Sequence, residues 1–460
     1  MNTFSLYRQL PIWMQNLLVT IKGRWLEHQR YGQYYKKAFR ELCVSDNWNQ
    51  EQILAYKEKQ LAHILKYAYE CCPYYKQKFD NANVSPDDFK HLNDIQKFPI
   101  LTKDEVREHW AEMLSTKVKR KDLVQYHTSG STGKALDFYW TKQSVQYYWA
   151  VVWRGRYRLG VKKGDLHLNF TGKLVVPLNQ RKPPYWRYNR ALNQYMLNMQ
   201  HIRKETVEDI AQFINNKHFR FFVGYPSIIY ELALLCNQTK QKITAPPEYI
   251  FTSAEKVYDY QRTAIQEVFP GSEIVEHYGF SEEACCASQC ECGIYHEDFE
   301  LGHLELHEPY CAENKLTGTL LATGFQNLGM PFIRYEIGDR AVFSERQCEC
   351  GRHNQVIENI EGRNEDYVIT KDGIRFTRLD YLLKDTKFIA EAQIVQRKIG
   401  QIIIRVVRKY GYNELEEQMI REIVHNQFSE NLKVEFEYVD FMKRTKAGKF
   451  RFVVNELIKK

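Results

Sequence analysis

A short run of glycine and hydroxyl residues has the clearest chemical potential in this sequence. It reads Thr128-Ser129-Gly130-Ser131-Thr132-Gly133-Lys134. Glycine lets backbone N–H groups approach a ligand closely, and successive turn N–H groups form a concavity that attracts anions. The lysine adds a point charge. A polyphosphate is the simplest ligand for such a loop, although the Walker A spacing is absent and a plain surface loop has a similar composition.

Two C-x-C-G turns form a second group of residues with defined chemistry. They are Cys290-Glu291-Cys292-Gly293 and Cys348-Glu349-Cys350-Gly351. Paired soft ligands of this kind favour a closed, tetrahedral zinc site. The predicted ligands are Cys290, His296, Cys348 and Cys350, with Cys292 and His353 as substitutes. Free thiols are the alternative, because C-x-C is a weaker signal than C-x-x-C.

Alternating strand and helix patterns predict the scaffold that positions such residues. Apolar runs at 221–227, 249–255 and 274–282 each end in a turn, and helical patterns lie between them. This alternation predicts an α/β fold with a mainly parallel sheet, which binds ligands beyond the carboxyl ends of its strands. The basic, proline-broken stretch 180–190 reads as a loop, either at a substrate entrance or on the plain surface.

Length and composition indicate a globular protein with two or more domains. The chain has 460 residues, 44% of them apolar and 27% charged. The net charge of +8 suits an anionic small ligand or a loose membrane association, and it does not indicate nucleic-acid binding. No signal peptide or membrane-spanning stretch is evident, so a cytoplasmic protein is expected.

The N-terminal segment, about residues 1–100, reads as mainly helical. Its first helical pattern has an apolar face that comprises Ile12, Trp13, Leu17, Leu18 and Ile21. Basic residues follow closely, among them Lys22, Arg24 and Arg30. Packing of this helix on its own domain is the commoner arrangement, and peripheral association with an anionic membrane is the alternative. Asp46-Asn47 is expected to cap the next helix.

The motif T-S-G-S-T-G resembles the phosphate-binding loop of the adenylate-forming superfamily. Within it, the chain most resembles the phenylacetate–CoA ligases and their capsule-biosynthesis branch, often called CapK-like, in which a zinc site is common. Matching motifs recur in the family's order from Tyr126 to Lys449. One departure is Ala135, where the family usually has proline, but alanine removes no ligand.

The resemblance implies a binding site for ATP or AMP with magnesium. It assigns Ser253-Ala254-Glu255 to the loop that contacts adenine and Tyr278-Gly279-Phe280-Ser281-Glu282 to the Y-G-x-[ST]-E motif. The Tyr278 ring offers a flat face to adenine, and Glu282 suits Mg²⁺ because a hard cation prefers carboxylate oxygen. Asp339 resembles the aspartate that binds both ribose hydroxyls, since an ionised carboxylate only accepts hydrogen bonds.

The resemblance also divides the chain into two domains. Gly362-Arg363-Asn364-Glu365-Asp366 matches a G-R-x-x-D hinge, where nucleotide contact by Arg363 is expected. An adenylation domain then covers residues 1–361, with the zinc site in 285–353. A small, mobile α+β domain with a β-β-α-β pattern covers residues 362–460. In its Gly448-Lys449 pair, the lysine resembles the one whose charge stabilises the transition state. The predicted catalytic residues are Thr128, Glu282 and Lys449.

These features predict an ATP-dependent ligase for a small carboxylic acid. The acid forms an acyl-adenylate with release of pyrophosphate, and a thiol, amine or sugar acceptor then takes the acyl group. The CapK-like branch implies capsule or O-antigen polysaccharide biosynthesis, with the enzyme in the cytoplasm or at the inner membrane surface. The alternative is an acyl-CoA ligase that uses coenzyme A. A rival of another class is a non-catalytic, zinc-stabilised scaffold that binds nucleotide.

Overall fold

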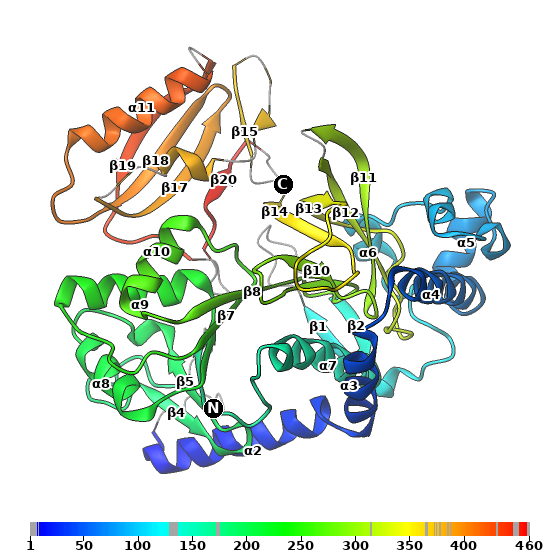
Figure 1. Cartoon of the computed structure of the whole chain (residues 1–460), viewed down its shortest axis with the longest axis horizontal. Helices are drawn as coiled ribbons and strands as arrows, with labels where there is room; N and C mark the ends of the chain where they lie inside the picture. Colours follow the sequence, from blue (N-terminus) through cyan, green and yellow to red (C-terminus); the bar gives the residue numbers. More distant parts are fainter. Residues whose placement is uncertain are drawn as a thin grey trace.

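A twelve-stranded mixed sheet and a four-stranded sheet organise the computed structural model of the chain (Figure 1). The structure describes residues 7, 9–127, 137–171, 175–312, 315–363, 367–371, 373, 375–376, 379–383, 386, 388–428, 431–444 and 450–457. The glycine-rich loop and the segment with Gly448-Lys449 lie outside these ranges. Predictions about those two segments therefore stay predictions.

The large sheet has the order β11-β12-β13-β14-β10-β9-β8-β7-β6-β3-β5-β4. Its strands are β3 (His167–Thr171), β4 (Trp186–Asn189), β5 (Gln194–Asn198), β6 (Phe221–Gly224), β7 (Tyr249–Ser253), β8 (Glu273–Gly279), β9 (Cys286–Gln289), β10 (Tyr295–Glu297), β11 (Gly302–Ala312), β12 (Lys315–Gly324), β13 (Tyr335–Ser344) and β14 (Val356–Arg363). Strands β5, β3, β6, β7 and β8 are parallel neighbours, as expected for an α/β fold. Antiparallel strands extend the sheet on both sides, so the sheet is mixed rather than mainly parallel, and its parallel part is limited to the five strands that alternate with helices.

Helices cover the large sheet and fill the N-terminal segment. They are α2 (Ile12–Arg30), α3 (Gln33–Ser45), α4 (Gln50–Cys71), α5 (Pro73–Asn81), α6 (Lys103–His109), α7 (Lys142–Arg158), α8 (Val207–Lys217), α9 (Pro226–Thr239) and α10 (Asp259–Val268). Short 3₁₀ turns lie at Pro86–Asp88, Leu92–Lys97, Arg120–Asp122, Arg190–Leu192, Met199–His201 and Asp380–Leu383. Among the described residues, no helix is long and apolar enough to cross a membrane.

Two local sequence predictions are corrected. Helix α4 is capped by Asn49, whose side chain accepts from the Gln52 N–H, and not by Asp46-Asn47. Asp46 instead binds the buried Arg154 at 2.9 Å. The stretch 180–190 is not all loop, because β4 occupies residues 186–189 and pairs with β5. The Trp186 ring stacks on Phe213, which anchors that strand.

The C-terminal part folds around its own apolar core, and this confirms the expected small α+β domain. Strands β17 (Ile389–Lys398), β18 (Gln401–Arg408), β19 (Lys433–Tyr438) and β20 (Val453–Asn455) form a sheet of order β19-β18-β17-β20. Helix α11 (Glu414–Phe428) packs on that sheet, and the β15 (Val368–Ile369) and β16 (Arg375–Phe376) pair precedes it. In Figure 1 this domain lies beside α9 and α10.

Candidate active site and metal centre

Three strand ends meet at one edge of the large sheet. The parallel strands β6, β7 and β8 end at Gly224, Ser253 and Gly279. The register pairs Gly224 with Thr252 and Ser253 with His277, so the turns that follow these strands lie side by side. The carboxyl edge of a parallel sheet is where α/β proteins bind ligands. The structure therefore brings together the loops after β7 and β8, which the sequence assigned to a nucleotide, and places the turn after β6 beside them.

Tyr278 at the end of β8 contacts Asp339 on β13. Its hydroxyl donates a 2.7 Å hydrogen bond to Asp339 Oδ2. Asp339 is also paired in the β13–β14 ladder with Arg363, the last residue of β14. Three residues predicted to bind nucleotide thus come together from separate parts of the sequence. A flat ring beside a carboxylate is an arrangement that can hold a base and its ribose.

Glu282 lies in the turn after β8 and is buried. Its Oε1 accepts a 2.5 Å hydrogen bond from the Tyr335 hydroxyl, which fixes the carboxylate near the β13 strand that carries Asp339. The other predicted residue of this turn, Ser281, is exposed. Glu283, which follows Glu282, has a left-handed backbone with a φ of 47°. Burial raises the pKa of Glu283 well above its usual range, a feature that sequence reasoning missed.

The Glu255 carboxylate accepts hydrogen bonds from backbone N–H groups, whereas the sequence assigned this residue to a loop that contacts adenine. Oε2 accepts from the Ser227 N–H at the start of α9 (3.2 Å), and Oε1 accepts from the Phe450 N–H (2.7 Å). Burial raises the pKa of Glu255, although these N–H donors oppose that effect. Ala254 before it has a φ of 68°, so the turn after β7 is tight. Both carboxylate oxygens of Glu255 are therefore engaged by protein groups.

The contact of Glu255 belongs to an interface between the large domain and the small domain. The Tyr230 hydroxyl on α9 donates to the Ala390 carbonyl on β17. The Tyr258 and Phe452 rings lie 4.8 Å apart between centroids. Phe450 directly follows Lys449 in the chain, so this interface holds the end of the predicted lysine segment against the turn after β7.

Glu391 and Arg444 add an ion pair beside this interface. Arg444 Nη2 lies 2.5 Å from Glu391 Oε1, and both side chains are largely buried. Burial raises the pKa of Glu231 on α9 to about 7, with Glu391 adding to the rise and Arg444 opposing it. A carboxyl group that titrates near neutral pH therefore lies close to the domain contact.

Strands β1 (Leu123–His127) and β2 (Asp137–Thr141) flank the predicted phosphate loop. They form an antiparallel hairpin in which His127 pairs with Asp137. Tyr126 packs on Trp140 at 4.7 Å between ring centroids, which holds the hairpin together. The loop between the strands, with the predicted residues Thr128 to Lys134, lies outside the described residues.

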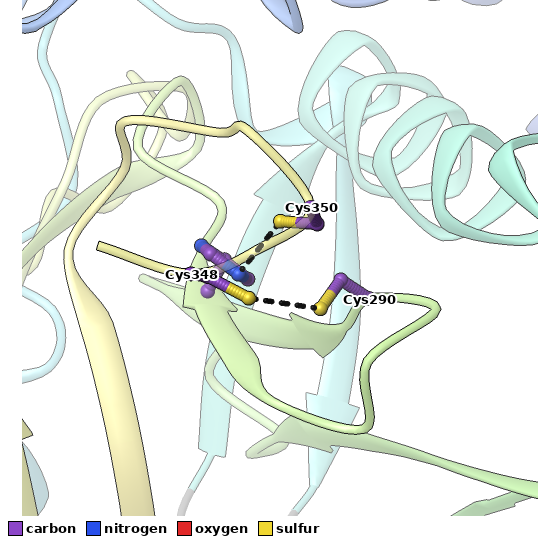
Figure 2. Close-up of side chains that lie close together, drawn as sticks. Cys290, Cys348 and Cys350 are labelled. Atoms are coloured by element: carbon purple, nitrogen blue, oxygen red, sulfur yellow. Dashed lines mark hydrogen bonds between the residues drawn. The ribbon is translucent and has the colours of Figure 1, made fainter. Parts of the chain in front are cut away.

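Four predicted metal ligands converge where the turn after β9 and strand β10 meet the loop between β13 and β14 (Figure 2). Their ligand atoms all lie within 4.8 Å of one another, and the residues are Cys290, His296, Cys348 and Cys350. The Sγ atoms of Cys290 and Cys348 are 3.7 Å apart, and Cys350 Sγ lies 3.3 Å from His296 Nε2. Tetrahedral zinc with Zn–S bonds of about 2.3 Å places two sulfurs about 3.8 Å apart. The geometry of the four residues fits that ion.

The two C-x-C-G segments form matching turns that present these cysteines. Gly293 N–H donates to the Cys290 carbonyl at 2.9 Å, and Gly351 N–H donates to the Cys348 carbonyl at 3.1 Å. Both glycines have positive φ, 71° and 76°, which favours glycine in each turn. Cys292 is exposed and is not among the four converging residues. Its N–H instead donates to Cys290 Sγ.

The four groups at this centre differ in how readily they take the protonation state that binds a metal. Burial lowers the pKa of His296 to about 4, so its imidazole is neutral at pH 7 and available to a cation. Burial opposes ionisation of Cys350, but hydrogen bonds from Arg352 and Cys348 outweigh it and lower the Cys350 pKa. A neutral histidine is a form that zinc binds, whereas burial raises the pKa of Cys290 to about 11 and also raises that of Cys348, so these two thiols resist ionisation unless a cation is bound.

Several aromatic side chains near the parallel strands lie in the core and do not line an open site. Tyr147, Trp153 and Phe222 are buried in apolar clusters, and Tyr225 packs against one of them. Tyr225 directly follows the end of β6, and His277 lies near the end of β8, where its Nε2 is 3.3 Å from the Tyr148 hydroxyl. For the three buried rings, core packing explains their position.

Comparison with known proteins finds relatives that match most of the chain. The CapK C-terminal domain family matches residues 368–456. The chain is 27% identical to protein CapK of Staphylococcus aureus, and the match covers 98% of this chain and 99% of that protein. It is 25% identical to phenylacetate-coenzyme A ligase of Thermus thermophilus, and that match covers 76% of this chain and 80% of the ligase. The chain is therefore similar to CapK and to phenylacetate–CoA ligases over most of its length, in line with the motifs of its sequence.

Both relatives belong to the phenylacetate–CoA ligase and CapK branch of the adenylate-forming ligases that the sequence motifs resemble. A solved structure shares its fold over most of both chains. It is the 2-hydroxyisobutyryl-CoA ligase in the postadenylation state with R3-HIB-AMP, with a TM-score of 0.71. The sequence identity is 17%, and the match covers 90% of this chain and 92% of that one.

Proposed function

We propose that this ligase activates a small carboxylic acid with MgATP. The acid oxygen attacks the α-phosphate, pyrophosphate leaves, and an acyl-adenylate forms. An acceptor nucleophile then attacks the acyl carbon and releases AMP. The observation that carries the proposal is the Tyr278–Asp339 hydrogen bond at the carboxyl edge of the parallel strands, next to the buried Glu282. ATP as the co-substrate implies a cytoplasmic reaction.

The roles of the individual residues follow from their chemistry. Asp339 would accept from the ribose hydroxyls, and Tyr278 would cover adenine. Glu282 would hold Mg²⁺ through its carboxylate. We assign the phosphates to Thr128 and the loop that ends at Lys134, because that loop joins the two strands of the β1–β2 hairpin.

The small domain would supply Lys449 to the reaction centre. Its ammonium would stabilise the charge that develops on the α-phosphate and the carboxylate. The support is the contact between Glu255 and Phe450, since it holds the residue after Lys449 next to the turn after β7. We propose that the two domains meet at residues 361–362 and that Arg363 beside this boundary contacts the nucleotide.

Three acceptor nucleophiles are candidates. The full-length match to CapK favours an amine or sugar hydroxyl in capsule or O-antigen polysaccharide biosynthesis. The match to phenylacetate-coenzyme A ligase favours the thiol of coenzyme A. Each acceptor would give a distinct product, an amide, an ester or a thioester.

We infer a structural zinc ion at Cys290, His296, Cys348 and Cys350. All four positions are filled by protein side chains, which leaves no open position for substrate. The ion would tie the turn after β9 to the loop between β13 and β14, so it would hold together the two sides of the antiparallel strands.

Pyrophosphate release is the experiment that tests the proposal. The full chain is incubated with ATP, Mg²⁺ and a broad panel of carboxylic acids, and each active acid is then tested with coenzyme A, amines and amino sugars. We expect release that depends on an acid and on Mg²⁺, and faster turnover with one acceptor class. Nucleotide binding without turnover on the whole panel would favour the non-catalytic scaffold.

A further inference from the structure

Helix α2 turns its apolar face away from the protein. Its exposed apolar residues, with exposed fractions, are Ile12 (37%), Trp13 (66%), Leu17 (51%), Leu18 (41%), Ile21 (55%) and Trp25 (48%). Positions 13, 17, 21 and 25 follow one another at four-residue intervals, so these side chains form a stripe along one side of the helix. A stripe of this kind marks an interaction surface.

The opposite face of α2 packs on the protein through polar and small residues. Gln15 Oε1 accepts from Arg187 Nε at 2.6 Å, and Asn16 Oδ1 accepts from the Tyr188 N–H at 3.0 Å. Gly23 is buried against the side chain of Asn189. The helix of a globular protein normally directs its apolar stripe to the core. In α2 that arrangement is inverted, which the protein's own core does not explain.

The charges on α2 indicate what covers this stripe. Lys22 and Arg24 are exposed beside it, and the Lys22 ammonium lies 3.4 Å from the centre of the Trp25 ring. The single acidic residue of the helix, Glu27, lies 3.1 Å from Lys163. A two-fold pairing of two α2 helices would bring like charges close together, whereas an anionic surface would neutralise them.

We propose that α2 lies in the interface of an anionic lipid bilayer. The stripe from Trp13 to Trp25 enters the boundary between headgroups and acyl chains, and Lys22 and Arg24 remain among the phosphates. In Figure 1, α2 runs along the margin of the molecule on the opposite side from the small domain, so lipid binding leaves that domain free. The proposal does not depend on the identity of the acid or acceptor.

Co-sedimentation of the full chain with lipid vesicles tests this proposal. One set of vesicles contains phosphatidylglycerol and phosphatidylcholine, and the other contains phosphatidylcholine alone. We expect binding to the anionic set, and a loss of about tenfold or more in Lys22→Gln/Arg24→Gln, because each basic residue contributes about fivefold. The apolar variant Trp13→Ser/Ile21→Ser/Trp25→Ser should lose more than about a hundredfold.

A matched control replaces three exposed apolar residues of the small domain, in the variant Tyr410→Ser/Leu415→Ser/Phe441→Ser. This control should bind the vesicles like the wild type. Thermal unfolding and pyrophosphate release should stay unchanged in the α2 variants, which separates lipid binding from folding and catalysis. Absence of wild-type binding, equal binding to neutral vesicles, equal binding by the apolar variant, or a solution dimer that this variant abolishes would each overturn the proposal.

Discussion

The Glu255 carboxylate accepts a 2.7 Å hydrogen bond from the backbone N–H of Phe450, the residue that follows Lys449. The two residues are 195 positions apart, and one belongs to the large domain and the other to the small domain. The same carboxylate is held by the Ser227 N–H at the start of α9. This contact couples the turn after β7 to the position of the small domain.

The change Glu255→Gln tests that coupling. We expect adenylate formation to slow about tenfold or more, because a hydrogen bond to a charged acceptor contributes about 1.5–3 kcal/mol. AMP affinity by calorimetry should stay within about twofold if Glu255 acts on the small domain. A large loss of AMP affinity would instead support the original adenine contact. Glu273→Gln, at an exposed site on β8, is the control.

Asp339→Asn tests the ribose site. The KM for ATP in pyrophosphate exchange should rise about 10–100-fold, since the variant loses a charged acceptor. Tyr278→Phe removes only the hydroxyl that donates to Asp339, so its effect should be about fivefold. The exposed Asp87→Asn should behave like the wild type. An unchanged KM in Asp339→Asn would exclude this residue from the nucleotide site.

Lys449→Ala tests the predicted catalytic lysine. Adenylation should slow about 10²–10³-fold, the usual loss when a charge-stabilising donor is removed. AMP binding measured by calorimetry should change little, because the charge acts mainly in the transition state. Lys446→Ala, three residues earlier, is the matched control and should retain most activity. Similar losses in both variants would show that no single lysine is responsible.

Metal analysis of the purified chain tests the zinc centre. We expect about one zinc ion per chain, and less than about a tenth of that in Cys348→Ser, because three remaining ligands bind zinc far more weakly. The melting temperature should fall in the same variant. Cys292→Ser should keep its metal, since Cys292 is exposed and lies outside the converging group. Full zinc content in Cys348→Ser would contradict the assigned ligands.

The pH dependence of stability tests the buried Glu231. Its pKa is raised from 4.5 to about 7 in the folded chain, mainly by burial. The folded state therefore holds this proton more tightly, so the stabilisation is fully present below pH 4.5 and is lost as the pH rises to about 7. Allowing for the partial exposure of Glu231, we expect a loss of about 1–2 kcal/mol.

The change Glu231→Gln removes that titration. Its unfolding free energy should vary less between pH 4.5 and 7 than that of the wild type, when both are measured by denaturant unfolding. Glu267→Gln, in the neighbouring helix α10, offers a control variant. A wild-type curve and a Glu231→Gln curve that stay parallel over this range would show that Glu231 does not titrate there.

Sequence reasoning succeeded where the signal is local. The strand-to-turn junctions at 221–227, 249–255 and 274–282 appear as β6, β7 and β8 with their following turns. The cap at Asp46-Asn47 was wrong because tertiary contacts decided between nearby polar residues. Asp46 forms an ion pair with the buried Arg154, and Asn49 caps α4. Local propensity cannot report a partner that lies 108 residues away.

The sequence by itself indicated the α/β class, the resemblance to adenylate-forming ligases and the residue types predicted to hold nucleotide and zinc, because these depend on short-range spacing. Only the tertiary structure decided which groups meet. It placed Cys290 beside Cys348 and Glu255 beside Phe450, and it turned the apolar side of α2 outward. Helical spacing shows that a stripe exists, but the direction of that stripe depends on the polar residues of β4 that α2 packs against.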